Sequence, residues 1–342
     1  MSVMTSAAKD HGPTRSDAAA ATIVSKSSLS LARVLADSFR RQHPDVPFFV
    51  ALADEVDGYF DPAAEPFALI RLRELQLPAL AGFVRRYSQQ ELTYACTPYL
   101  LAHLLDRGFS RVAFFKQESL VTGDLTPELE LLREHCIVLT PHLLEPLASD
   151  DQLEREAVIL QSGVFNVGFL GISESAEARR FLLWWQDRLC EHCRHDVPSG
   201  IHFEQRWLDL VPSFFEGVAM VRDPGFNVAH WNLPDRTVRT DGDAITVDGR
   251  PCRFVRFSGF DPRRPERPTR YFARLSMEAL GDAAILFRRY NELLHAAGWQ
   301  ETSRWPYAYR RRSVMLRTLM RRLRPMLRAR QLAGRIYRTV RE

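Results

Sequence analysis

Residues 111–118 read RVAFFKQE, a hydrophobic run that ends abruptly in a lysine, an amide and a carboxylate. Five apolar-rich residues followed by polar ones are typical of a buried strand and the loop after it. Ligands of open α/β proteins bind beyond the carboxyl ends of the parallel strands. The stretch therefore predicts a central strand at 111–115 and a binding site at Lys116, Gln117 and Glu118.

Strand and helix patterns alternate on both sides of this stretch. Ser88, with Glu91 three residues later, forms a capping box that opens one of the helices. The predicted strands cover 47–54, 67–72, 111–115, 135–140 and 252–262, the predicted helices cover 31–39, 88–107, 127–134 and 175–192, and a hairpin is predicted at 240–251. This order predicts an α/β fold with a mainly parallel central sheet flanked by helices.

Composition limits the class of protein. The chain has 342 residues, 46% of them hydrophobic, and no stretch reaches the roughly 18–20 continuous apolar residues of a membrane-spanning helix. Residues 1–21 are rich in Ala, Ser and Thr without an apolar core, which favours a disordered leader over a secretory signal. The five scattered cysteines indicate reduced thiols in a cytoplasmic protein.

Charge is unevenly distributed along the chain. The net charge is +4, yet residues 304–342 contain thirteen arginines, no lysine and one acidic residue. Apolar residues recur at helical spacing over 314–330, so this tail is expected to form a basic amphipathic helix, with Pro325 bending or restarting it. Such a helix can dock on an anionic membrane surface or pack on the acidic body. Nucleic-acid binding is not expected, because no recognition motif accompanies the charge.

Six segments in register resemble bacterial glycosyltransferases of the GT-A nucleotide-diphospho-sugar transferase fold. The likeness is to glycosyltransferase family eight and its relatives in polysaccharide clusters. The segments are 30–54, 90–115, 162–172, 204–212, 223–233 and 256–262. The resemblance implies a GT-A catalytic domain at 22–262, a C-terminal extension at 263–303 that packs on it, and the tail at 304–342. The proline-broken segment RRPERP (263–268) is expected to mark the edge of the catalytic body.

The resemblance also implies a metal site that this sequence has altered. In the family, an Asp-x-Asp motif after the strand matching 111–115 and a later histidine hold Mn²⁺ or Mg²⁺ against the nucleotide diphosphate. Here Lys116 and Glu118 stand at the aspartate positions, and Arg256 stands at the histidine position. Two cations could neutralise the diphosphate without a metal. Retained metal binding, and a degenerate site whose side chains only form ion pairs, are the alternatives.

Candidate catalytic residues follow from the same resemblance. An Asn-x-Gly motif matches Asn166 and Gly168, and the Asp-Gln pair that flanks the donor sugar matches Glu204 and Gln205. Glu204 is expected to bind donor hydroxyls, and Gln205 to face the anomeric carbon. Local explanations also exist: a buried amide bonded to nearby backbone for Asn166, and a solvated carboxylate at a helix start for Glu204.

The donor-binding set is completed by residues at other strand ends. Lys26 follows the first strand and Asp54 the second, where a base or ribose would be read, although Lys26 is equally explained as a helix-entry lysine. Gly259, in the segment RFSG, belongs to the same set.

The sequence thus predicts a cytoplasmic glycosyltransferase that moves a sugar from a nucleotide diphosphate donor to an acceptor. Its acceptor could be a lipid-linked glycan, which would place the enzyme on the inner face of the membrane. No cofactor is required, although Mn²⁺ or Mg²⁺ remains possible. The alternative is a catalytically inactive scaffold or partner subunit at the membrane surface.

Overall fold

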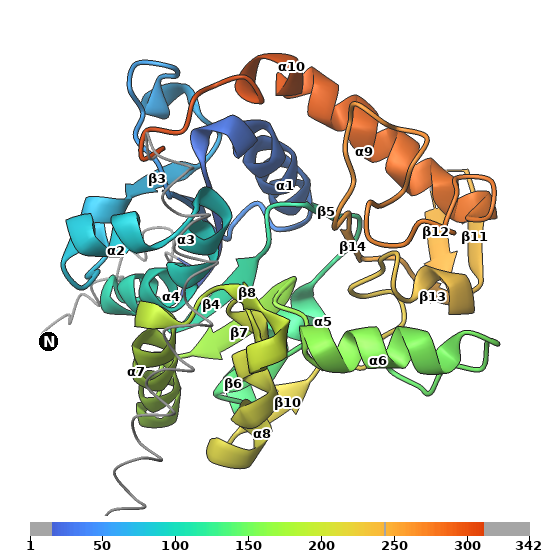
Figure 1. Ribbon diagram of the computed structural model, residues 1–342, viewed down its shortest axis with the longest axis horizontal. Helices are drawn as coiled ribbons and strands as arrows, with labels where there is room; N and C mark the ends of the chain where they lie inside the picture. Colours follow the sequence, from blue (N-terminus) through green and yellow to red (C-terminus); the bar gives the residue numbers. More distant parts are fainter. Residues whose placement is uncertain (1–15, 243, 311–342) are drawn as a thin grey trace, which may run out of the picture. The chain divides into compact units, whose positions relative to one another are not determined.

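A computed structural model describes residues 16–242 and 244–310 (Figure 1). The chain up to Ala308 belongs to one compact unit, and Tyr309–Glu342 belongs to a second. The amphipathic helix predicted at 314–330 lies outside the described residues, as does most of the predicted leader. The leader boundary is corrected, because the first strand already begins at Ala18 and includes residues 18–21. Among the described helices, none is long and apolar enough to cross a bilayer.

A mainly parallel central sheet is confirmed. Within the described part of the chain its seven strands lie in the order β10-β6-β7-β4-β1-β2-β3, and only β7 runs antiparallel to its neighbours. The strands are β1 (Ala18–Val24), β2 (Phe48–Leu52), β3 (Ala68–Arg71), β4 (Arg111–Phe115), β6 (Ile137–Leu139), β7 (Phe169–Ser173) and β10 (Val218–Met220). Strand β4, predicted from the FF run, lies at the centre of this sheet.

Helices cover both faces of the sheet because side chains of successive strand residues point to opposite sides. Helices α1 and α5 share one hydrophobic core with Ala20, Val50 and Phe115. Helix α4 contacts β4 and α7. The helices are α1 (Leu29–Gln42), α2 (Leu80–Arg86), α3 (Gln89–Ala95), α4 (Thr97–Asp106), α5 (Thr126–Glu134), α6 (Gln152–Ser162), α7 (Ala176–Glu191), α8 (Val211–Phe214), α9 (Ala284–Ala296) and α10 (Trp299–Thr302).

The prediction of one continuous helix over 88–107 is wrong. The structure divides it into α3 and α4 at Cys96. Pro98 is the reason: it has no backbone N–H to donate and its ring clashes with the preceding turn, so it fits the first turn of a new helix. The capping box at the start of α3 is present as predicted, with the Ser88 hydroxyl accepting from the Glu91 amide and the Glu91 carboxylate accepting from the Ser88 amide.

Smaller strands lie outside the central sheet. Strand β14 pairs with β5 beyond the end of β4, in antiparallel register, so that Arg256 stands opposite Ser119. The predicted hairpin forms β11 and β12, and β13 pairs with β12. These strands are β5 (Ser119–Val121), β8 (His195–Asp196), β9 (Ile201–His202), β11 (Val238–Asp241), β12 (Ala244–Val247), β13 (Arg250–Pro251) and β14 (Phe254–Arg256).

Helix α9 packs on β14 and on the residue that follows it. Its residues Phe287, Tyr290 and Leu294 share a second hydrophobic core with Val255 and Phe257. The Tyr290 ring stacks on Phe257 at 3.9 Å between centroids. Figure 1 shows α9 and α10, in orange, passing over α1 and the β5–β14 pair. Phe257, the residue directly after β14, is thereby packed against α9.

Candidate functional site

A large pocket lies where β4 ends. Its cavity volume is about 880 Å³, within the range of small-molecule sites. Gln117 and Glu118 line it from the β4–β5 loop, Tyr94 lines it from α3, and Tyr290 lines it from α9. The pocket therefore occupies the position at which the sequence predicted a ligand site.

Lys116 points away from solvent and forms a buried ion pair. Its Nζ lies 2.6 Å from Oε1 of Glu204, a fully buried carboxylate, and 3.7 Å from the centre of the Tyr94 ring. Burial by itself would lower the pKa of Lys116, but Glu204 and Tyr94 outweigh it and raise that pKa. Burial also raises the pKa of Tyr94 to about 12. Near neutral pH the site thus holds an ammonium ion between a carboxylate and a neutral phenol.

Arg256 is buried on the neighbouring strand β14. Its Nη1 donates to the Ser119 hydroxyl at 3.0 Å and lies 3.7 Å from the Glu118 carboxylate. The Ser119 hydroxyl in turn donates to the Lys116 carbonyl at 2.6 Å. One serine therefore links the two strand ends that carry the cations, and Glu118 lies nearest to Arg256.

Gly168 explains how closely these groups approach. A Cβ atom on Gly168 would lie 2.3 Å from Oδ1 of Asn166 and 2.7 Å from Cδ and Nε of Arg256. The Gly168 carbonyl accepts from the Lys116 amide at 3.0 Å. The side chains of Arg256 and Asn166 and the backbone of Lys116 therefore all contact Gly168, and a larger residue would clash with the first two.

Asn166 and Gln205 are joined by hydrogen bonds. Oδ1 of Asn166 accepts from the Gly168 amide at 2.7 Å, so the local-backbone explanation holds for this oxygen. Nδ2 of Asn166 donates to Oε1 of Gln205 at 3.3 Å, and Nε2 of Gln205 donates to the Ser162 carbonyl at 3.0 Å. In this arrangement Gln205 fixes Asn166. The solvated explanation of Glu204 is wrong, since that side chain is fully buried.

Three histidines, of which His142 is buried and His202 and His230 are partly buried, lie near the two cations. Burial lowers the pKa of His142 and of His202 to about 4 each, and that of His230 to about 3, with nearby cations contributing. Nε2 of His142 lies 3.0 Å from the Asn166 amide nitrogen, and its Nδ1 lies 3.2 Å from the Val164 carbonyl. A neutral ring with the proton on Nδ1 satisfies both contacts. Sequence reasoning missed these residues, which no motif marks.

Several buried polar atoms around the cations lack a hydrogen-bond partner among the described residues. They include Nε of Arg256, Oε2 of Glu204, Oε1 of Gln117, Nδ1 of His202 and the hydroxyl of Tyr290. Buried polar groups in folded proteins almost always find a partner. Two of these residues, Gln117 and Tyr290, line the large pocket.

Lys26 and Asp54 are placed differently. Nζ of Lys26 donates to the Glu55 carbonyl at 3.1 Å and pairs with Asp57 at 2.6 Å and with Asp54 at 3.5 Å. The Asp54 carboxylate accepts from the backbone amides of Lys26, Glu55 and Ala308. Burial raises the pKa of Asp54, and those hydrogen bonds oppose the rise. The two side chains bind each other and the backbone, which favours a structural role.

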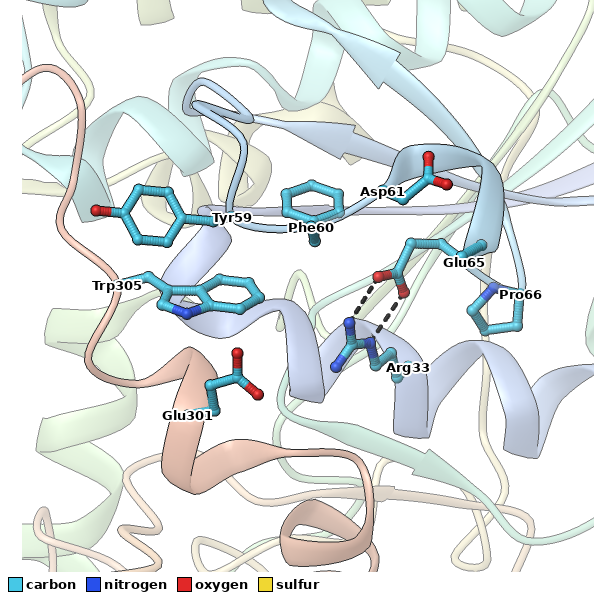
Figure 2. Close-up of a pocket in the computed structure, with 9 residues that line it drawn as sticks. Arg33, Tyr59, Phe60, Asp61, Glu65, Pro66, Glu301 and Trp305 are labelled. Carbon is cyan, nitrogen blue, oxygen red and sulfur yellow. Dashed lines mark hydrogen bonds and ion pairs between the residues drawn. The ribbon is translucent and has the colours of Figure 1, made fainter.

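Figure 2 shows a smaller hollow beside this pair, with a volume of about 350 Å³. Trp305 stacks on Phe60 with 5.9 Å between ring centres, and Arg33 binds the Glu65 carboxylate through two nitrogens at 2.9 and 2.6 Å. The hollow is where residues 301–305 pack on the loop after β2. Its arginine is already paired with Glu65.

Sequence reasoning also missed the segment after Gly259. Residues 261–270, here called the strap, line the large pocket and do not merely mark the edge of the catalytic body. Gly259 has a φ of +79°, and a Cβ there would lie 2.6 Å from Thr269 and from Tyr271. The glycine thus lets the chain turn back over the pocket, and the strap contributes the arginines Arg263, Arg264, Arg267 and Arg270. The run of arginines between prolines was the available signal.

The residues present do not fit the divalent ion that the fold family implies. Among the described residues, no group of three His, Cys, Asp or Glu side chains could hold a metal ion. Lys116 and Arg256 stand at two of the expected ligand positions, and their positive charges would repel such an ion. Hard cations require oxygen ligands, of which only Glu118 remains at these positions.

Comparison with solved structures identifies the fold. The chain resembles the galactosyltransferase LgtC, solved in complex with donor and acceptor sugar analogs, with a TM-score of 0.50 and 18% identity over 83% of this chain and 99% of that one. The fold is that of a GT-A glycosyltransferase. No family model matches the sequence.

Two proteins of Bacillus subtilis (strain 168) are similar in sequence. YfnF, named as an uncharacterized protein, is 25% identical over 251 residues, which are 70% of this chain and 80% of YfnF. YfnD, also named as uncharacterized, is 23% identical over 201 residues, which are 57% of this chain and 62% of YfnD.

Proposed function

We propose that the protein is a glycosyltransferase that moves a sugar from a nucleotide diphosphate donor to an acceptor, with protein cations in place of a metal ion. The observation that carries this proposal is the large pocket at the end of β4, which Gln117 and Glu118 line. Two buried cations adjoin that lining: Lys116 precedes Gln117 in the chain, and Arg256 lies 3.7 Å from Glu118. The GT-A fold and its likeness to LgtC support it.

In the proposed reaction the acceptor hydroxyl oxygen forms a bond to the anomeric carbon of the donor sugar, and its proton passes to the departing diphosphate or to water. The bond from that carbon to the diphosphate oxygen breaks, and the nucleoside diphosphate leaves with the electron pair. Guanidinium and ammonium groups fixed beside the leaving oxygen stabilise its negative charge and need no reorganisation during the step. Arg256 and Lys116 are proposed to supply this charge from behind the pocket lining, which includes Glu118 and Gly259.

The donor sugar is proposed to lie against Glu204, Asn166 and Gln205. Oε2 of Glu204 has no hydrogen-bond partner among the described residues and can accept from a sugar hydroxyl. Gln205 holds Asn166 in place through its amide oxygen. The base is proposed to lie near the ends of β1 and β2, where Ser27 and Ser28 line the pocket. Lys26 and Asp54 would then support that wall without touching the ligand.

Thermal unfolding with a panel of nucleotide sugars in EDTA tests the function. A ligand that binds only the folded state stabilises it, by roughly 3 kcal/mol at a hundredfold excess over Kd. The melting temperature rises accordingly. The proposal expects at least one nucleotide sugar to raise it, and incubation of that donor with candidate acceptors to release nucleoside diphosphate. A panel in which no member shifts the transition, with or without Mn²⁺, would instead favour the inactive scaffold.

A further inference from the structure

The charges at the inner end of the large pocket are already balanced. Lys116 is paired with Glu204 at 2.6 Å, and Arg256 lies 3.7 Å from Glu118. Each cation therefore faces one carboxylate, and the two pairs together contribute no net charge. A diphosphate can still accept hydrogen bonds from these groups, but the excess positive charge of the pocket must come from elsewhere.

The outer wall supplies that excess. Its arginines are exposed, and only Arg263 forms a salt bridge within the described residues, to Asp261 at 2.8 Å. Arg270 donates to the Tyr271 hydroxyl at 2.8 Å. The pocket-lining arginines that make no salt bridge to a described carboxylate are Arg264, Arg267, Arg270 and Arg304.

The strap presents its arginines on a fixed backbone. Pro262, Pro265 and Pro268 restrict its φ angles, which lowers the conformational entropy lost when a ligand is bound. Its amides close successive turns, from Arg264 to the Asp261 carbonyl at 2.8 Å and from Arg267 to the Arg264 carbonyl at 3.0 Å. This wall is therefore organised before a ligand arrives.

The beginning and the end of the strap lie together. The Arg270 amide donates to the Gly259 carbonyl at 3.0 Å, which places Arg270 beside the turn that follows Arg256 and Phe257. Arg264 and Arg267 lie between these two ends and also line the pocket.

Charge balance then indicates a second anion. A nucleotide-sugar diphosphate carries roughly two negative charges, and Glu266 in the strap carries one, so the four arginines without a salt bridge still leave about one positive charge uncompensated. We propose that Arg264 and Arg267 form a second anion subsite, and that it holds a phosphate group carried by the acceptor. This inference rests on the proposed function and names the acceptor class as a phosphate-bearing glycan or lipid-linked glycan.

Calorimetry with inorganic pyrophosphate as the probe tests this assignment. The full-length protein is first saturated, in EDTA, with the nucleoside diphosphate that binds it, and pyrophosphate is then titrated. We expect pyrophosphate to bind the saturated protein, and the Arg264→Gln/Arg267→Gln variant to lose at least about tenfold in pyrophosphate affinity, because charge-assisted hydrogen bonds to phosphate are removed. Its affinity for the nucleotide should change by less than about threefold.

A matched control removes the same charge elsewhere. Arg239 and Arg250, on β11 and β13, are exposed and do not line the pocket. The Arg239→Gln/Arg250→Gln variant should bind both ligands as the unmodified protein does. An equal loss of pyrophosphate affinity in this control would show a nonspecific charge effect and would overturn the subsite.

Other outcomes separate the two proposals. If nucleotide displaces pyrophosphate and the strap variant loses both ligands, the arginines form one donor site and the second subsite is wrong. If no nucleotide binds but pyrophosphate binding still depends on Arg264 and Arg267, the anion subsite stands and the proposed function fails. Sodium glucuronate, titrated in the same way, should bind more weakly than pyrophosphate; tighter binding would overturn the assignment to phosphate.

Discussion

Two buried lysines stand at the ends of neighbouring strands, and their surroundings differ. Lys26, after β1, is held by a carbonyl and two carboxylates, and its partner Asp54 accepts from three backbone amides. Lys116, after β4, faces Glu204, whose second oxygen has no hydrogen-bond partner in the described part of the chain. A buried lysine thus indicates a ligand site only where its neighbours retain unused hydrogen-bonding capacity.

The largest predicted effect compares the two lysines directly. Removing one partner of a buried ion pair strands the other charge, so Lys26→Met and Lys116→Met should each lower the free energy of unfolding by about 3–5 kcal/mol. Only Lys116→Met should weaken nucleotide binding, by at least about tenfold. Urea unfolding and calorimetry at a temperature where both variants are folded measure the two effects.

A double variant sharpens the same comparison. Lys116→Met/Glu204→Leu removes both charges and should recover much of the lost stability, because an apolar pair avoids the desolvation penalty. Nucleotide binding should remain weak. Recovery of nucleotide affinity together with stability would mean that the ion pair only supports the fold, as the pair at Lys26 does.

Another variant adds one methyl group beside Asn166 and Arg256. Gly168→Ala places a Cβ within 2.7 Å of Arg256 and should cost about 2–4 kcal/mol of stability, with weaker nucleotide binding, since the core cannot yield without moving the guanidinium. Gly82→Ala in α2, where the nearest atom is 3.9 Å away, is the control and should be neutral or stabilising. Equal behaviour of the two variants would contradict the close approach at Gly168.

Low pH should lower the free energy of unfolding by protonating His142, which lies near Lys116. Burial lowers the pKa of His142 from its ordinary value of 6.5 to about 4, so the folded state resists protonation. This contribution to stability is complete above pH 6.5 and is lost as the pH falls towards 4, amounting to about 3 kcal/mol. The His142→Gln variant should therefore lose less stability than the unmodified protein between pH 7 and pH 4, as measured by urea unfolding. Parallel pH profiles for the two proteins would refute the role of His142.

The smallest predicted effect concerns the serine between the two cations. Ser119→Ala removes the hydroxyl that accepts from Arg256 at 3.0 Å and donates to the Lys116 carbonyl at 2.6 Å. The loss of a buried hydrogen bond should reduce stability by about 1–2 kcal/mol and nucleotide affinity by a few fold. Ser38→Ala, whose hydroxyl donates to Leu35 near β5, gives the comparison for a serine outside the pocket. It should reduce stability similarly and leave nucleotide affinity unchanged.

Much of the fold could be predicted from the sequence, because the strands are short apolar runs and the helices carry periodic patterns and caps. The strand at 111–115 has the predicted bounds, whereas the helix at 88–107 was misjudged because the pattern continued through Pro98. The resemblance predicted that Lys116 and Arg256 would stand at the former metal-ligand positions, and this role stays a prediction. Their carboxylate partners depend on how distant segments pack, which periodicity does not reveal.

The strap was the main omission. It has no hydrophobic period, and its prolines read as a boundary in the sequence. Its role is set by the turn at Gly259 and by α9, which holds Phe257 and therefore the start of the segment against the pocket. A loop stabilised by packing at both ends can form a binding wall without any signal of regular secondary structure.

In the proposed mechanism, positive side chains neutralise the diphosphate in place of a divalent ion. Calorimetric titration of UDP and GDP into the full-length protein, in EDTA and again with Mn²⁺, tests this most directly. We expect one nucleotide to bind in EDTA with an affinity that Mn²⁺ changes by less than about threefold, and to bind more weakly as salt is raised. Binding that appears only when Mn²⁺ is present would contradict it.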